Sequence, residues 1–262
     1  MTPERAFFDL QLRFASEAAP RLGFALERAL LDCTNLYVRF GAGRDFDAAR
    51  PLWRDYTGGV RVCADFHALS EWTWRFYQRC PVQRAAPVVV AAFGCFAWAR
   101  DPHGGARVHF DPHAAASHTS HADHSRSPLD AREAPRRRDE LRALVAHMHS
   151  QGLNDDAMVH GTSWLYNVPA YRRLFPDAYV NSAQRVERLR ALSLWGQFID
   201  RYGRVRNHAA AALLDNLKSR NRMENDNETS CDFSTLAQHF PLQALAVRAP
   251  LRVFDALNHA HR

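Results

Sequence analysis

The feature that most constrains the fold of this chain is an apolar run followed by a turn and a second short run. Residues 87 to 99 read PVVVAAFGCFAWA, which is rich in the β-branched and aromatic residues that favour strands. DPHGG, at 101 to 105, has the composition of a turn, and ARVHF follows it. The pattern predicts a β-hairpin. Gly94 within the first run indicates a bulge or a close approach to the backbone.

Before the hairpin, the sequence predicts helices. Two sets of apolar residues recur at the spacing of one helix face and predict two of them: Leu26, Ala29, Leu30, Cys33 and Tyr37, and then Leu69, Trp72, Phe76 and Cys80. Residues 1–84 are therefore expected to form a helical N-terminal portion.

After the hairpin, residues 111–130 are small and polar and predict a long exposed loop. A helix is expected from Pro135 until Gly152. AMVHGTSWLYN, at 157 to 167, predicts a strand that enters a turn. Asn167 is expected to cap a short helix that extends through Phe175.

DAYVN, at 177 to 181, is expected to be a further strand, and Trp195, Phe198, Ile199 and Tyr202 predict one more helix. Strands on both sides of a crossover helix imply a mixed sheet, with the 157 to 163 strand parallel to a hairpin strand. The predicted class is α+β, a helical N-terminal portion followed by a mixed β-sheet flanked by helices. Residues 85–220 would form the core domain. Residues 221–262 would form a linker and a helical C-terminal appendage that includes Leu236, Phe240, Leu242, Leu245 and Val247.

The composition favours an ordinary globular protein. No run approaches the roughly 18 apolar residues that a membrane helix needs, and the N-terminus lacks the pattern of a secretory signal, so a cytoplasmic location is expected. The net charge is +6, but of the 34 basic residues only Lys218 is a lysine, and the arginines are scattered among acids. Nucleic acid and membrane are therefore not expected partners.

Five cysteines without a CxxC pair predict thiols rather than disulfides: Cys33, Cys63, Cys80, Cys95 and Cys231.

Polar and aromatic residues are densest in GTSWLYN, where the predicted strand turns. Ser163 and Tyr166 could donate hydrogen bonds to a ligand and Trp164 could line an apolar slot, because ligands of open sheets lie beyond the carboxyl ends of strands. The other interpretation is that Trp164 packs in the core and that Asn167 only caps a helix.

Two histidines lie near the ends of predicted strands. His109 is in ARVHF and His160 is in AMVHG, and on neighbouring strands their imidazoles could approach and supply a proton acceptor near neutral pH. Each could equally be a hydrogen-bonded core residue.

Two further clusters invite a functional interpretation. Arg136, Arg137 and Arg138 lie in the first turn of a predicted helix, where they oppose the helix dipole unless an anion binds there or nearby acids neutralise them. The loop histidines are loosely spaced and lack an accompanying cysteine, so no metal is expected: His113, His118, His121 and His124.

The order of elements from 87 to 205 resembles GNAT-like acyltransferases, in which some divergent members have a Ser-Trp-Leu strand end before a short helix, as in GTSWLYNVPAYRRLFP. The resemblance implies an acyl-CoA or acyl-carrier thioester held between the strands at 106 to 110 and 157 to 163. It implies His109 or His160 as the base and Tyr166 as the acid. Family members bind the pyrophosphate with a glycine-containing loop, which residues 111 to 135 lack, so the three arginines would take its place.

The sequence thus favours an acyltransferase that moves an acyl group from a carrier thioester to an amine, with a small-molecule substrate. Two alternatives stay open. One is a non-catalytic module that binds a ligand or partner through Ser163, Trp164 and Asn167. The other is a metal-dependent hydrolase that uses the loop histidines.

Overall fold

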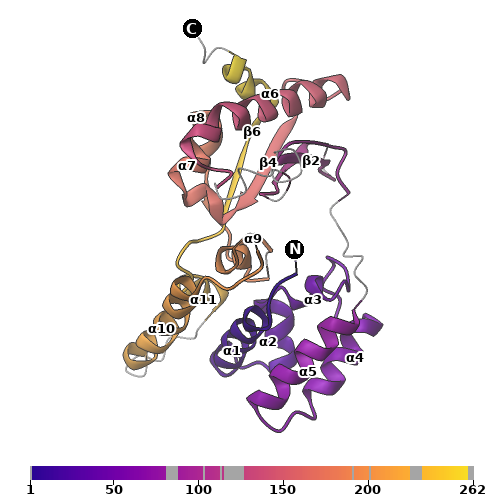
Figure 1. Ribbon diagram of the computed structural model, residues 1–262, viewed down its shortest axis with the longest axis vertical. Helices are drawn as coiled ribbons and strands as arrows, with labels where there is room; N and C mark the ends of the chain where they lie inside the picture. Colours follow the sequence, from indigo (N-terminus) through magenta and orange to yellow (C-terminus); the bar gives the residue numbers. More distant parts are fainter. Residues whose placement is uncertain are drawn as a thin grey trace. The chain divides into compact units, whose positions relative to one another are not determined.

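The chain forms two compact units in the computed structural model (Figure 1). One unit combines Met1–Ala86 with Glu187–Gln243, and the other combines Pro87–Val186 with Ala244–Arg262. The first boundary lies close to the predicted end of the helical portion, whereas residues 187–220 belong to the helical unit and not to the core domain. The structure describes residues 2–80, 88–102, 104–112, 114, 127–190, 192–200, 202–224 and 232–258.

The first unit is helical. Its core is aromatic: Phe14 of the first helix packs edge-on against Trp195 and Phe240, with ring centroids 5.5 and 5.1 Å away. The predicted helix over Leu69 to Cys80 is confirmed and begins at Asp65, whose side chain accepts a hydrogen bond from the Ala68 N–H. The elements are α1 (Arg5–Leu22), α2 (Leu26–Cys33), α3 (Leu36–Arg39), α4 (Pro51–Val60), α5 (Phe66–Arg79), α9 (Leu192–Trp195), η4 (Gly196–Phe198), α10 (Asn207–Glu224) and α11 (Phe233–Ala237).

The helix predicted over Trp195 to Tyr202 is wrong. The chain makes the short α9 and η4, after which Ile199 forms an isolated bridge with Val205. Trp195 and Phe198 are buried, but Tyr202 is 58% exposed, so these residues do not share one helix face. Packing of the Trp195 indole against rings from distant segments decides the local structure here.

The second unit is built on a six-stranded mixed sheet, which confirms the predicted α+β class (Figure 1). The strand order is β1-β2-β3-β4-β6-β5. β3 and β4 are parallel, as predicted, and the other pairs are antiparallel. The strands are β1 (Ala91–Phe93), β2 (Phe96–Arg100), β3 (Ala106–Phe110), β4 (Met158–Ser163), β5 (Gln184–Arg185) and β6 (Leu245–Pro250).

One face of this sheet packs against helices. α6 (Ala134–Ser150) begins with Pro135 in its first turn, as predicted, and contributes Leu141, Leu144 and Met148 to the core. Gly152, with φ +82°, follows the helix. The remaining helices of the unit are η2 (Ala131–Glu133), η3 (Trp164–Asn167), α7 (Pro169–Arg172), α8 (Asp177–Val180) and η5 (Leu251–Asn258).

Two predictions of local structure in this unit are wrong. DAYVN forms α8, with Tyr179 and Val180 buried, and not a strand. The C-terminal segment is helical only in part, in α11 and η5. Residues 245–250 form β6, which pairs with all six residues of β4. Val247 and Ala249 face the core while Arg248 between them is exposed, an alternation that belongs to a half-buried strand.

Gly59 of α4 has a packing role that Gly58 lacks. A Cβ atom on Gly59 would overlap the indole of Trp72, whereas a Cβ atom on Gly58 would meet nothing within 4 Å. We expect Gly59→Ala to lower the free energy of unfolding by about 1–3 kcal/mol. Gly58→Ala should leave it unchanged or raise it by up to about 1 kcal/mol, because alanine favours the helix. Urea denaturation of both variants tests this, and equal midpoints would contradict it.

Candidate functional site

The parallel strands β3 and β4 part before they end. Their register contains only two pairs, Ala106 with Val159 and Arg107 with His160. β3 nevertheless continues to Phe110, paired with β2, and β4 continues to Ser163, paired with β6. The ladder between β3 and β4 therefore stops before residues 108–110 and 161–163, and we call these two facing segments the splay. This is the rim at which the sequence predicted a ligand site.

Side chains beside the splay alternate between the two faces of the sheet. Val108 and Gly161 are buried on the face that carries α6. His109 and His160 lie on the opposite face, half-buried, on neighbouring strands. The structure thus brings the two predicted histidines to one face, with His160 beside the last pair of the two strands and His109 in the parted segment.

Tyrosine hydroxyls lie directly under the splay, on the helix face. Tyr166 is 2% exposed, and its hydroxyl lies 3.1 Å from the Tyr179 hydroxyl. Burial, reinforced by the neighbouring Tyr179, raises the pKa of Tyr166 well above its usual value. Burial also raises the pKa of Tyr171, which is hydrogen-bonded to Tyr166. These hydroxyls stay protonated near neutral pH, so each can donate a hydrogen bond.

Gly161 lets this pair of hydroxyls approach the strand. A Cβ atom at this position would overlap the Tyr166 hydroxyl and would stand 2.5 Å from the Tyr179 hydroxyl. Sequence analysis placed Gly161 at the turn but missed Tyr171 and Tyr179. The signal for Tyr179 was hidden because its segment was taken for a strand.

The polar residues of GTSWLYN build the turn itself. The Ser163 Oγ accepts a hydrogen bond of 3.1 Å from the Leu165 N–H, which starts η3. The Asn167 Nδ2 donates to the Trp164 carbonyl over 2.8 Å. Asn167 was expected to cap the next helix, but the N-cap of α7 is Val168. Trp164 is half-buried. The described polar contacts of Ser163 and Asn167 are therefore local.

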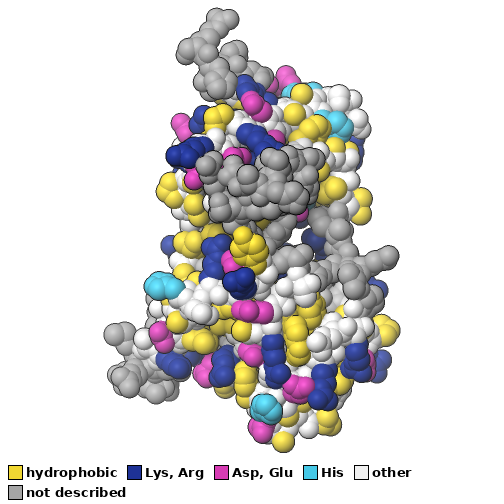
Figure 2. Space-filling model, viewed as in Figure 1, with side chains coloured by type: hydrophobic (Ala, Val, Ile, Leu, Met, Phe, Trp, Pro, Cys, Tyr) yellow, Lys and Arg dark blue, Asp and Glu magenta, His cyan; other side chains and the backbone are white. Residues whose placement is uncertain are grey.

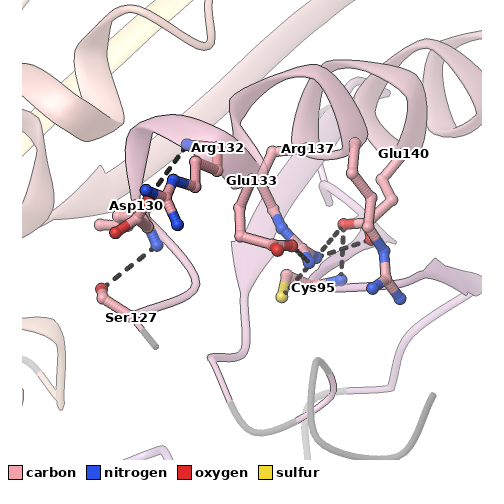
Figure 3. Close-up of polar contacts among 9 residues, drawn as sticks. Cys95, Ser127, Asp130, Arg132, Glu133, Arg137 and Glu140 are labelled. Carbon is pink, nitrogen blue, oxygen red and sulfur yellow. Dashed lines mark hydrogen bonds and ion pairs between the residues drawn. The ribbon is translucent and has the colours of Figure 1, made fainter. Parts of the chain in front are cut away.

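Arg137 is buried in an ion-pair network and cannot hold a ligand (Figure 3). Its side chain is 1% exposed, and Nη2 donates to Glu133 over 3.1 Å. Nη1 donates to both carboxylate oxygens of Glu140, at 2.6 and 2.5 Å, and to the Cys95 Sγ. Glu140 also accepts the Cys95 N–H over 3.0 Å, and a Cβ atom on Gly94 would overlap its carboxylate. The predicted close approach to Gly94 is thus made by Glu140.

The other two arginines diverge from Arg137. The Arg136 Nε lies 3.3 Å from Glu140, and its side chain is 38% exposed. The Arg138 Nη2 donates to the Arg173 carbonyl over 3.2 Å. The three side chains therefore do not converge on one anion. The expectation that all three form a phosphate site is corrected for Arg137, because Glu133 and Glu140 already compensate its charge.

Two further predictions concern metal ligands and thiols. No group of three His, Cys, Asp or Glu side chains that could hold a metal occurs among the described residues. The loop histidines of the metal hypothesis lie outside the described residues. Cys33, Cys63, Cys80 and Cys95 are thiols, as predicted, and Cys231 lies outside the described residues.

Charged side chains intermingle on the surface shown in Figure 2, where Lys and Arg lie among Asp and Glu. Within the described ranges, none of the helices has both the length and the apolarity to cross a membrane.

No protein-family model, curated protein or solved structure matches this chain.

The environment of Arg137 predicts a structural role. Arg137→Met leaves Glu133 and Glu140 without their buried partner, so we expect it to lower the free energy of unfolding by about 3–5 kcal/mol. Arg138→Met, on the same helix turn, should cost less than about 1 kcal/mol. Denaturant unfolding of both variants measures the difference. Similar losses in the two variants would argue against the buried network.

Proposed function

We propose that this protein transfers an acyl group from a carrier thioester to an amine. The observation that carries the proposal is the splay, the parting of β3 and β4 after Arg107 and His160. The topology of the sheet also supports the resemblance to GNAT-like acyltransferases. β1, β2 and β3 form an antiparallel arm, α6 crosses over into the parallel β4, and the sheet ends in the order β4-β6-β5.

The splay suits an extended thioester such as acyl-CoA or an acyl carrier arm. Where two strands part, their facing backbone groups lose their ladder partners and can bond an added extended chain. The carrier arm contains amide groups, so it can be bound as a strand is bound. Backbone N–H groups at the splay would then polarise the thioester carbonyl.

In this proposal, the proton acceptor and the proton donor lie on opposite faces of the sheet. The amine nitrogen attacks the thioester carbonyl carbon, the C–N bond forms and the C–S bond breaks. His109, or His160 beside it, accepts the proton that the amine loses on the open face. The Tyr166 hydroxyl lies on the helix face, next to Gly161, and supplies the proton that the leaving thiolate gains.

Arg136 and Arg138 remain as candidate contacts for the phosphates of the donor. Arg136 lies in the first turn of α6, where the helix dipole favours an anion, and Arg138 lies just beyond that turn; both side chains are partly exposed. Arg137 has no place in this proposal, because its guanidinium is enclosed by carboxylates. Ser163, Trp164 and Asn167 would shape the rim rather than contact the donor through their hydrogen-bonding groups.

Donor binding gives the first test of this proposal. We expect acetyl-CoA to raise the melting temperature and to slow amide hydrogen exchange within residues 108–110 and 161–163, because it would fill the splay. Thiol release with a panel of amines then measures turnover. Protection elsewhere, or no stabilisation by any coenzyme A thioester, would contradict the acyltransferase proposal. Protection without turnover would favour the non-catalytic binding module.

A pair of tyrosine variants tests the proton donor. Tyr166→Phe and Tyr179→Phe both remove the hydrogen bond between the two hydroxyls, and Tyr166→Phe also removes the one to Tyr171. We therefore expect Tyr179→Phe to destabilise the fold by about 1 kcal/mol and Tyr166→Phe by about 2 kcal/mol. Only Tyr166→Phe should lower kcat, by about 10- to 100-fold, if its hydroxyl protonates the thiolate. Steady-state kinetics on both variants measures this contrast. Equal rates in the two variants would remove Tyr166 from the mechanism.

A further inference from the structure

The open face of the sheet, opposite α6, carries a row of basic side chains beside the splay. The register places Arg107, His160 and Arg248 side by side on β3, β4 and β6. Both arginines are exposed and His160 between them is half-buried. Adjacent strands lie about 4.8 Å apart, so the two arginine Cα atoms stand about 10 Å apart, with the imidazole between them. We call these three residues the basic row.

The charge of the basic row is only partly compensated. The Arg107 Nη2 donates to the nearly buried Asp101 over 3.0 Å, which engages one of the five N–H donors of that guanidinium and orients it. Among the described residues, no Asp or Glu occupies a strand position on this face. A carboxylate or phosphate over His160 would meet one guanidinium from each side.

The next row toward the splay consists of small residues around His109. Ala97 pairs with His109 on one side of the splay, and Thr162 pairs with Ala246 on the other. The two alanines that flank this row are small and partly exposed. Two residues along a strand span about 6.6 Å, so the basic row lies about that far from the row in which the amine would be deprotonated.

We propose that the acyl acceptor is a short primary amine that carries a carboxylate or phosphate group, bound by Arg107 and Arg248 while its nitrogen lies beside His109. The separation of the two rows fits the length of a four-carbon ω-amino acid. The inference rests on the proposed acyl transfer only in treating the bound amine as the acyl acceptor. The binding of the anionic amine to the basic row can be measured without any donor.

Calorimetric titration of the whole chain with three amines tests the proposal in the absence of a thioester. 4-Aminobutyrate and 3-aminopropylphosphonate should bind, the stronger of them identifying the preferred anion, and n-butylamine should not. Arg107→Met and Arg248→Met should each weaken binding about tenfold or more. Arg107→Lys should lose less affinity, because it keeps the charge but not the fork.

Arg185→Met is the matched control. Arg185 is exposed on β5 of the same sheet, but its register with Leu245 places it on the helix face. Its loss should leave affinity unchanged, and Arg185→Met and Arg248→Met should keep the wild-type melting temperature within a few degrees. Arg107→Met removes the partner of the nearly buried Asp101 and should melt lower, so its affinity is measured well below its melting temperature. Equal binding of n-butylamine, or equal losses in Arg185→Met and Arg248→Met, would overturn the proposal.

The two proposals fail in different ways. If acetyl-CoA protects the splay but no anionic amine binds, the acceptor class is wrong and acyl transfer stands. If the anionic amines bind through Arg107 and Arg248 while no thioester binds, the basic row is an anion site and the acyl transfer is wrong.

Discussion

The contact between Gly161 and the hydroxyls of Tyr166 and Tyr179 is the constraint on which the site depends. Gly161 is the first residue of β4 beyond the last pair with β3, and the hydroxyls occupy the space that a side chain would fill. The buried tyrosines pack against β4 on the helix face, and all six residues of β4 pair with β6. It can therefore diverge from β3 without losing its position in the sheet.

A second constraint fixes the hairpin against the crossover helix. Glu140 reaches from α6 to the backbone of the β1–β2 turn, where Gly94 leaves room for its carboxylate and Cys95 donates its N–H. Arg137 compensates the buried charge of Glu140. A paired and hydrogen-bonded carboxylate tolerates burial that an isolated one would not. The same turn of α6 therefore orients β1 and β2, leaving only Arg136 and Arg138 for a ligand.

The sequence was informative where structure depends on neighbours in the chain. The hairpin, α6 and the parallel β4 follow from local periodicity and turn residues, and so does the placing of His109 and His160 on neighbouring strands, although His160 lies within β4 and not at its end. The sequence was misleading where contacts with distant parts of the chain determine the local structure. Residues 245–250 become a strand because β4 offers an edge, and DAYVN becomes helical while burying Tyr179 beneath Gly161. From the sequence alone, Arg137 looks like a phosphate ligand. Its burial could not be foreseen, because it depends on the contact of Glu140 with the distant turn at Cys95.

In the proposed acyl transfer, the two faces of the sheet beside the splay would take different roles. On the helix face, Tyr166 is buried and its pKa is raised, which keeps its hydroxyl protonated. On the opposite face, two histidines and two arginines lie on paired strands, and both arginines are exposed. The proposal therefore places the proton acceptor and the proton donor on opposite sides of one carbonyl carbon, separated by the backbone of β3 and β4.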